Sequence, residues 1–417
     1  MISGSRISIF VRRRIHRGSA KVFSYRSVVV CLLFLAGCTT LPSRPRRTVV
    51  ETQVAIVPAR IVGNFFLIES RQDDGRVRRF LIDTGSTATI VSPELAAALR
   101  LKEKRPAQRG KVHVRGADGA DLELPAATLR RLWIGQAKFE KVAVLVFNFA
   151  DLSSHLGLPV DGIIGFPLFH GALLTLDYPG SRLVVAPSPA ASAAPVAPGQ
   201  AERTSTLAFN DEQGTPLIPV QLGNESFYAL IDSGSDGPLT LNPAGLHPRF
   251  LSGPRVGSLV ASLGGNRPQT TGRLAQDLLL GSHIIEQPVV DLTDQLSSIG
   301  GEFLRHFSVT FDQRRRLVTF VRDAAGPVKM EARRSSGLSF GRSPAYWRVL
   351  QVVPDTPAAT LPVQVGDLCV RINGEPVAKW DQERFGALLR SAAKITFTFL
   401  ASATERDVEV PVCELVP

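Results

Sequence analysis

The chain has 417 residues, which exceeds the usual size of a single domain, so two or three compact units are expected. Its composition, with 44% hydrophobic and 20% charged residues, is typical of a globular protein and excludes a disordered or fibrous one. Residues 1–37 contain seven basic and no acidic residues, so only +4 of the net charge of +11 belongs to the rest of the chain. That remainder has no basic stripe with interleaved aromatic residues. We therefore expect no nucleic-acid partner.

The N-terminus is typical of an export signal. Its basic region is followed by the apolar run VVVCLLFLA, Val28 to Ala36, which is too short to cross a hydrocarbon core of about 30 Å. The adjoining LAGC resembles the lipobox of bacterial lipoproteins and implies cleavage before Cys38 and lipidation of its sulfur. Thr39 favours the outer membrane by analogy. We therefore expect a signal peptide over residues 1–37 and a periplasmic, lipid-anchored protein; the alternative is an ordinary secretory signal with an incidental cysteine.

Two stretches of biased composition divide the rest of the chain. Residues 38–56 are polar, basic and contain proline, and predict a tether. The Ala/Pro/Ser run PSPAASAAPVAPG has neither the charge nor the periodicity of a core element and predicts a linker over residues 188–203. The compact units are then expected at residues 57–187, 204–325 and 326–417, with a softer boundary before the last.

The first two units resemble each other, which predicts a duplication. In each, an apolar strand leads into an aspartate, Asp83 in FLIDTGS and Asp232 in ALIDSGS. Each later has an apolar-Gly element and a strand that ends in aspartate, and both glycines precede that aspartate by twelve residues. Short alternating runs such as KVHVRG and KVAVLVF predict strands. We therefore expect two similar, mainly β lobes in a pseudo-two-fold arrangement.

The clearest helix signal is SPELAAALRL, Ser92 to Leu101. Ser92 is expected to cap this helix, because its side chain can accept a hydrogen bond from an N–H of the first turn. Pro93 suits that first turn, where its missing N–H has no intrahelical partner to lose.

The two aspartate loops together indicate acid–base chemistry. Gly85 and Gly234 let the backbone turn sharply and approach a facing chain, so that Asp83 and Asp232 project from rigid loops. Two carboxyl groups that face each other cannot both ionise easily and are expected to share a proton across a water molecule. One carboxylate can then take a proton from the water while the protonated one donates to the substrate carbonyl, which makes hydrolysis of a peptide bond without a metal possible.

Four hydroxyl side chains in the same loops are candidate supports. Ser86 and Ser235 are expected to hydrogen-bond the outer carboxylate oxygens and to hold one aspartate ionised. Thr84 and Ser233 are expected to reach across and lock the loops together.

These motifs resemble the two halves of a clan AA aspartic protease of the retropepsin and pepsin kind. The resemblance rests on IDTGS with IIG and on IDSGS with SIG, and it covers about residues 57–325. It implies that the apolar-Gly elements pack beneath the catalytic loops; their residues are Ile164, Gly165, Ile299 and Gly300. Two copies in one chain imply an intrachain pseudo-dimer, an aspartic endopeptidase that needs no cofactor and acts on peptide or unfolded-protein substrates.

The chain departs from the pepsin pattern in two respects. Neither candidate flap hairpin, around residues 116–119 and 264–266, contains a tyrosine, and Ser298 stands where the first copy has Ile163. These departures favour an alternative function, that of a non-catalytic peptide-binding envelope lipoprotein, an adaptor or assembly factor on a protease-like scaffold.

No metal or cofactor site is predicted. The seven histidines lack the H-E-x-x-H spacing, and no C-x-x-C pair is present, as a zinc site would require. Two cysteines, Cys369 and Cys413, lie outside the signal and the lipidation site. We expect them either to form one disulfide or to be two buried free thiols.

Residues 326–417 resemble a PDZ domain over nearly its full length, and a helix from Asp381 to Ser391 would flank its groove. The residues similar to the carboxylate-binding loop are Gly337, Leu338, Ser339 and Phe340. Such a groove accepts an extended peptide by strand addition, with loop N–H groups holding the terminal carboxylate. The resemblance thus implies a peptide ligand and PDZ-assisted substrate recognition. Ser339 replaces the usual second glycine, and the alternative is a domain that only packs against the protease lobes.

Overall fold

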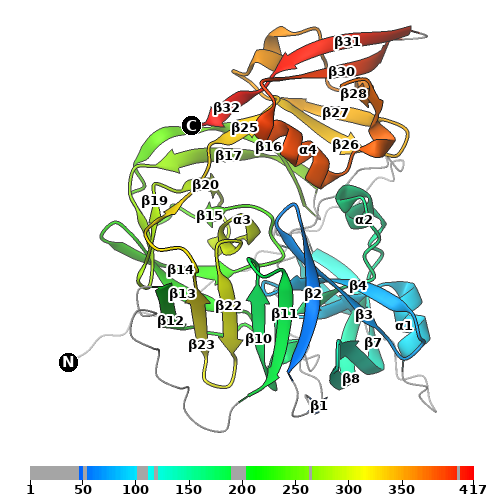
Figure 1. Ribbon diagram of the computed structural model, residues 1–417, viewed down its shortest axis with the longest axis vertical. Coiled ribbons are helices and arrows are strands. Elements are labelled where there is room, and N and C mark those ends of the chain that lie inside the picture. The colour runs from blue at the N-terminus through cyan, green and yellow to red at the C-terminus, as the bar shows by residue number, and fades with distance from the viewer. Residues whose placement is uncertain are drawn as a thin grey trace, which may run out of the picture.

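The computed structural model describes residues 47–49, 54–100, 111–116, 121–188, 203–262, 265–401 and 404–417. The expected signal peptide, Cys38, most of the tether and linker, and the tips of the two candidate flap hairpins lie outside these residues. The described chain is mainly β, as the sequence predicts, with two lobes and a C-terminal unit at one end of them (Figure 1). Within those ranges no helix is both long enough and apolar enough to span a membrane.

The first lobe is built around the strand that ends in Asp83. Its elements are β1 (Arg47–Val49), β2 (Ala55–Val62), β3 (Phe65–Arg71), β4 (Val77–Asp83), β5 (Thr89–Val91), α1 (Pro93–Leu99), β6 (Lys111–Arg115), β7 (Asp121–Ile134), β8 (Ala137–Val146), α2 (Ala150–Leu156), β9 (Gly162–Gly165), η1 (Phe166–Phe169), β10 (Ala172–Asp177) and β11 (Arg182–Pro187). The predicted helix is α1. Ser92 caps it, since its hydroxyl accepts a hydrogen bond from the Leu95 N–H at 3.2 Å.

The second lobe repeats the construction of the first. Its elements are β12 (Thr204–Ala208), β13 (Leu217–Leu222), β14 (Glu225–Ile231), β15 (Leu239–Leu241), β16 (Phe250–Ser262), β17 (Gly265–Leu274), β18 (Leu278–Leu280), β19 (His283–Glu286), β20 (Val289–Leu292), β21 (Ser298–Ile299), α3 (Gly301–Leu304), β22 (Ser308–Asp312) and β23 (Leu317–Val321). The strand before each aspartate lies parallel to the apolar-Gly strand, β4 with β9 and β14 with β21. β5 and β15 then pair antiparallel with that same strand.

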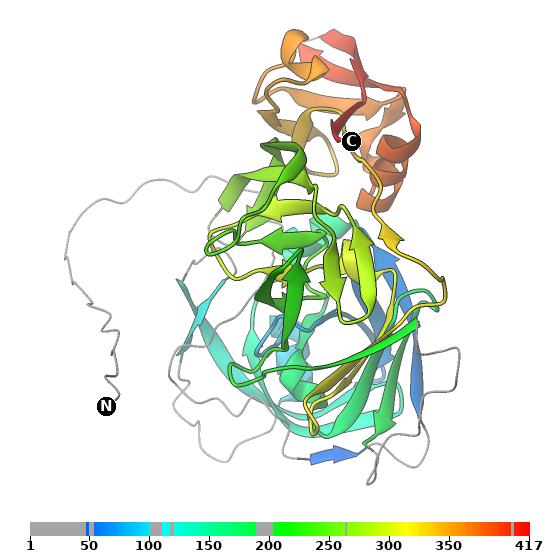
Figure 2. The same ribbon diagram turned by 90° about the vertical axis from the view of Figure 1, so that its left-hand side faces the viewer.

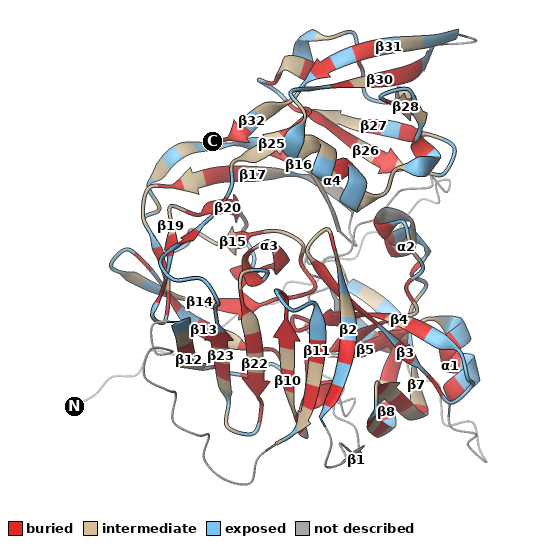
Figure 3. Ribbon diagram, viewed as in Figure 1, coloured by how far each residue is buried: buried red, intermediate tan, exposed pale blue. Residues whose placement is uncertain are grey.

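The two lobes share a sheet and a core. β10 and β22, the strands that follow the two apolar-Gly elements, pair antiparallel with Thr175 opposite Thr310. The sheet continues in the order β12-β23-β22-β10-β11-β2, so that each lobe contributes one side. One hydrophobic cluster runs through both lobes, and a second lies within the first lobe. Figure 3 shows the buried residues on the central strands. The lobes therefore form one packed body whose two halves meet at this strand pair.

The C-terminal unit has a core of its own. Its elements are β24 (Val328–Lys329), β25 (Arg333–Ser335), β26 (Leu338–Arg342), β27 (Trp347–Val352), η3 (Pro357–Thr360), β28 (Leu368–Ile372), β29 (Glu375–Pro376), η4 (Val377–Lys379), α4 (Gln382–Ser391), β30 (Lys394–Ala401), β31 (Thr404–Pro411) and β32 (Cys413–Val416). β24 pairs with β19, which carries the second lobe's sheet as far as Lys329. The predicted helix is α4, capped by Asp381. Cys369 and Cys413 are free thiols, and burial raises the pKa of Cys369 to about 12.

The C-terminal unit lies against both lobes, as Figures 1 and 2 show. On the second lobe, the Leu259 N–H of the β16–β17 hairpin donates to the Ser339 hydroxyl at 3.0 Å. On the first lobe, Arg60 forms an ion pair with Glu383 of α4 at 3.2 Å. The surface of the unit that bears α4 is consequently held over the region between the lobes.

Candidate active site

The two aspartate loops face each other where the lobes meet. Asp83 ends β4 and Asp232 follows β14, and their exposed fractions are only 1% and 3%. Their carboxyl groups are close enough for each to shift the pKa of the other. The backbone of Gly234 packs directly against Asp83, since a Cβ on that glycine would lie 2.3 Å from the Asp83 Cγ. One chain thus brings together both aspartates that the sequence singled out.

Reciprocal hydrogen bonds lock the loops, as expected for Thr84 and Ser233. The Thr84 hydroxyl donates to the Ile231 carbonyl oxygen at 2.7 Å, and the Ser233 hydroxyl donates to the Ile82 carbonyl oxygen at 2.8 Å. Each hydroxyl also accepts the backbone N–H of the other residue at 3.0 Å. Four buried hydrogen bonds between the two copies therefore set the separation and orientation of the aspartates.

Ser86 and Ser235 act differently from what the sequence suggested. The Ser86 hydroxyl donates to the Ala88 carbonyl oxygen at 2.8 Å, and the Ser235 hydroxyl accepts the Gly237 N–H at 3.4 Å. Both serines therefore brace the loop beyond the aspartate. The carboxylates are instead held by backbone groups of the glycines, because the Gly85 N–H donates to the Asp83 Oδ1 at 2.8 Å and Gly234 N–H to Asp232 Oδ1 at 3.0 Å.

The apolar-Gly elements pack beneath the aspartate loops. Ile164 and Ile299 are fully buried and pair alongside the strands that lead to the aspartates. A Cβ on Gly165 would lie 2.4 Å from the Ala88 carbonyl oxygen, and one on Gly300 would lie 2.4 Å from the Gly237 carbonyl oxygen. Only glycine permits this close approach at both positions, which explains why the repeat retains Gly after an apolar residue.

Burial raises the pKa of both aspartates, whereas their proximity raises the pKa of Asp83 and lowers that of Asp232. For Asp83, burial raises the pKa well above its usual range, the charge of Asp232 raises it further, and the Gly85 N–H offsets part of this rise. For Asp232, burial raises the pKa to about 6. The Asp83 Oδ2 is buried and accepts no hydrogen bond from the described residues, so a proton there relieves an unpaired charge. Asp83 is thus the carboxyl that retains the shared proton.

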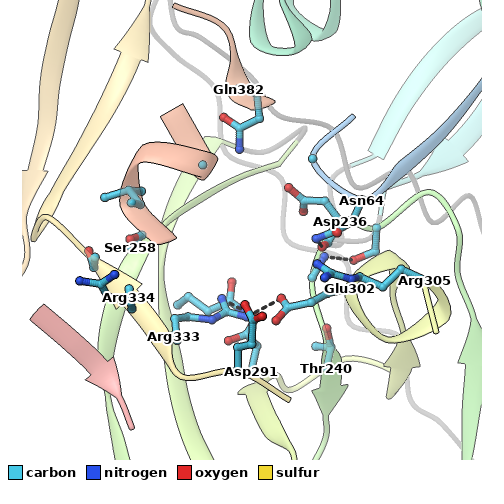
Figure 4. A pocket seen from close by; sticks show the side chains of 18 of the residues that line it. Asn64, Asp236, Thr240, Ser258, Asp291, Glu302, Arg305, Arg333, Arg334 and Gln382 are labelled. Carbon is cyan, nitrogen blue, oxygen red and sulfur yellow. Dashed lines mark hydrogen bonds and ion pairs between the residues drawn. The ribbon is translucent and has the colours of Figure 1, made fainter. Parts of the chain in front are cut away.

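A cavity of about 700 Å³ borders Asp232. Figure 4 shows this cavity from close by. Both lobes and the C-terminal unit line it, through Asn64 of the β2–β3 turn, Ser258 of β16, and Gln382 of α4. The Asn64 side chain also donates to the Asp236 carbonyl oxygen at 2.9 Å, which connects the lobes across the cavity floor. Its volume is within the range of about 300–1,000 Å³ found for sites that bind ligands.

Tyr178 also borders this cavity, and sequence reasoning missed it. Burial raises the pKa of its phenol, as do the charges of Asp232 and Asp83, and its hydroxyl has no hydrogen-bond partner among the described residues. Tyr178 directly follows Asp177, the end of the first repeated strand. The second copy has Gln313 at the matching place, and its amide donates to the Phe166 carbonyl oxygen. The difference between Tyr178 and Gln313 at matching places of the repeat is the sequence signal that could have identified Tyr178.

The four residues expected to form a peptide-carboxylate loop lie at the start of β26. The Gly337 N–H donates to the Ser335 hydroxyl at 2.9 Å and the Leu338 N–H to the Ser336 hydroxyl at 3.4 Å. Phe340 packs on Trp347 and Phe397 within the unit's core. Two of the loop's N–H groups are therefore already bonded within the chain. Metal-binding clusters of three or more His, Cys, Asp or Glu are absent from the residues that the structure describes.

Comparisons with known proteins agree with the geometry of the first lobe. Residues 70–168, which include Asp83 and the first apolar-Gly element, match a family model described as aspartyl protease. Among solved structures, basic 7S globulin from soybean is similar with a TM-score of 0.36 and 12% identity, over 65% of this chain and 95% of that one. A comparison with curated proteins found no match. Residues 70–168 therefore have an aspartyl-protease-like scaffold.

Proposed function

We propose that the protein is an aspartic endopeptidase that hydrolyses peptide bonds of protein substrates. The observation that carries the proposal is the Thr84–Ser233 lock, which holds two buried aspartates from the two halves of one chain face to face. A turn motif with only a local structural role has no need of a matching partner loop, nor of two carboxyl groups placed where both cannot ionise.

The proposed mechanism follows from the unequal environments of the pair. Asp232, as the carboxylate, takes a proton from a water molecule, whose oxygen then attacks the scissile carbonyl carbon. Asp83 donates its proton to the carbonyl oxygen, which gives a neutral tetrahedral diol. Collapse of the diol breaks the C–N bond, the proton on Asp232 passes to the leaving nitrogen, and Asp83 recovers a proton from the diol. The two carboxyl groups end the cycle as they began it.

The test is hydrolysis of a peptide library by full-length protein and by Asp83→Asn and Asp232→Asn. Each variant should lose cleavage, and pepstatin should inhibit the wild type. Asp294→Asn makes the same chemical change at an exposed position and should retain activity. Near-full activity in either aspartate variant would refute the single-chain pair and point to pairing between two molecules.

The cellular setting belongs to the same proposal. The basic N-terminus, the short apolar run and LAGC support export to the periplasm and lipidation at Cys38. Thr39 supports an anchor in the outer membrane by analogy. In cells, Cys38→Ser should release the protein from the membrane fraction and abolish incorporation of labelled lipid. Membrane association that survives this substitution would refute a lipid anchor.

A peptide-binding adaptor is the second candidate function. The observation that favours it is the C-terminal unit, which is held over the cavity. The loop N–H groups of Gly337 and Leu338 do not add to this, because they already bond within the chain. Recognition of peptide ends by the PDZ-like unit remains part of the main proposal, and would require these two N–H groups to exchange partners. No cleavage between about pH 3 and pH 8 with peptide binding retained would support the adaptor.

A further inference from the structure

An acidic cluster lies beside Asp232 on the second-lobe side of the cavity. Asp236 belongs to the loop after Asp232, Asp291 to β20, and Glu302 to α3, and all three line the cavity (Figure 4). The cation among them is Arg333 of β25, from the C-terminal unit. Its guanidinium lies 3.1 Å from the Glu302 Oε2 and 3.6 Å from the Asp291 Oδ2.

The cluster holds more negative charge than Arg333 neutralises. Burial raises the pKa of Asp291 and Glu302, and raises that of Asp236 to about 6, although Arg333 lowers all three. Two other arginines that line the cavity do not neutralise the remaining negative charge. Arg334 is hydrogen-bonded to carbonyl oxygens at the end of α4, and Arg305 affects the pKa of Glu302 alone among the three.

One acceptor of the cluster is unused. The Asp291 side chain is only 6% exposed, and its Oδ1 has no hydrogen-bond partner of good geometry among the described residues. The nearby Thr271 hydroxyl lowers the pKa of Asp291, but it donates to the Val290 carbonyl oxygen at 3.2 Å. A buried carboxylate oxygen without a donor is costly, so a donor that enters the cavity would be bound favourably. The described carboxylates do not form a metal-binding group, whereas the cavity has room for a whole side chain. A side-chain ammonium or guanidinium group satisfies both requirements, charge and hydrogen-bond donation.

We propose that Asp236, Asp291 and Glu302 form a subsite that binds a lysine or arginine side chain of the peptide substrate. Arg333 is the resident cation of the same subsite and competes with the incoming side chain. The inference rests on the proposed function, because it names the substrate class for that cleft. It also gives the C-terminal unit a role in specificity, since that unit supplies Arg333 to a site next to Asp232.

The test measures equilibrium binding of fluorescent peptides to the full-length Asp83→Asn variant, so that hydrolysis cannot interfere. Peptides are paired, with lysine or its uncharged isostere norleucine at one position at a time. At one position the lysine peptide should bind at least about tenfold more tightly. Adding Asp291→Asn or Glu302→Gln should bring that ratio toward one, whereas adding Arg333→Met should increase it. Asp294→Asn, an exposed acid three residues from Asp291, is the matched control and should leave the ratio unchanged.

The outcomes separate this inference from the peptidase proposal. No lysine preference at any position, or a preference that survives both acid variants, overturns the subsite. Lysine-dependent binding without hydrolysis by the wild type keeps the subsite and rejects the peptidase. Hydrolysis by the wild type without a preference for basic side chains keeps the peptidase and rejects the subsite. Thermal melts identify a variant that fails to fold. Asp291 and Glu302 lie on different elements, so if one variant does not fold, the other still tests the subsite.

Discussion

Gly234→Ala should disrupt the aspartate pair by steric overlap alone. The added methyl carbon would lie 2.3 Å from the Asp83 Cγ and 2.5 Å from both carboxylate oxygens. Non-bonded carbon atoms prefer a separation of about 3.5–4.0 Å, so either the loop or the Asp83 carboxyl must move by more than about 1 Å. Neither group moves freely, because the Thr84–Ser233 hydrogen bonds hold both loops.

The magnitude follows from this displacement. A shift of about 1 Å in a catalytic group costs on the order of 100-fold in rate, and overpacking in a well-packed site costs about 1–3 kcal/mol of stability. We expect kcat/KM for peptide hydrolysis to fall at least about 100-fold, with a lower midpoint of denaturant unfolding.

The control is Gly237→Ala, the same substitution in the same loop. There the methyl carbon would lie 3.6 Å from the Asp291 Oδ2 and 3.7 Å from the Ser235 hydroxyl, which are ordinary contact distances. Both kcat/KM and the unfolding midpoint should stay near those of the wild type. Equal behaviour of the two variants would refute the packing of Gly234 against the Asp83 carboxyl.

Three further predictions concern the same cleft. Thr84→Val leaves the Ile231 carbonyl oxygen and the Ser233 N–H buried without a hydrogen-bond partner, which should lower the free energy of unfolding in denaturant by about 2–4 kcal/mol. The control Thr175→Val, also between the lobes, should lower it by about 1 kcal/mol. Equal losses in the two variants would contradict the lock. The pKa of Asp236 is raised from 3.8 to about 6, so the folded state binds this proton more tightly than the unfolded state does. The contribution of Asp236 to the free energy of unfolding therefore falls as the pH rises from about 4 to about 6. Asp236→Asn should make this fall smaller, and an unchanged pH profile of stability would contradict the prediction. Tyr178→Phe removes a buried hydroxyl that has no partner among the described residues, so the free energy of unfolding should stay the same or rise by up to about 1 kcal/mol. A loss of stability would contradict this and reveal a hydrogen bond to that hydroxyl.

The C-terminal unit is coupled to the active site through few but well-placed contacts. Arg333 enters the acidic cluster, and the Arg60–Glu383 ion pair ties α4 to the first lobe. The latter pair is exposed, so it contributes little free energy. The contacts around Arg333 are more consequential, because a charge removed from a partly buried cluster leaves its partners unpaired.

Much of the aspartate site was predictable because its contacts are encoded locally and then repeated. The apolar strand, the Asp-(Thr/Ser)-Gly-Ser turn and the distant apolar-Gly element occur twice, and each copy forms the same parallel strand pair. The helix α1 was predictable for a similar reason, since Ser92 and Pro93 act within one turn. Once both copies fold alike, the lock between Thr84 and Ser233 follows from symmetry.

The roles of individual polar groups were less predictable. The sequence shows that Ser86 and Ser235 lie close to the aspartates, but their hydroxyls bond the loop beyond, and backbone N–H groups bond the Oδ1 atoms of the aspartates instead. Which of several nearby donors serves an acceptor depends on ångström-scale geometry that residue spacing does not specify.

By itself, the sequence determined the duplication, the mainly β character of the lobes and the identity of both aspartates, because these depend on short-range patterns of apolar residues, glycines and turns. Only the tertiary structure decided what surrounds them. Tyr178, Glu302 and Arg333 lie far apart in the chain and at positions without a motif, and meet around one cavity because three packed units close over it. Burial there raises the pKa of Tyr178 and Glu302, the neighbouring carboxylates raise that of Arg333, and both effects come from the assembled fold rather than from any one segment.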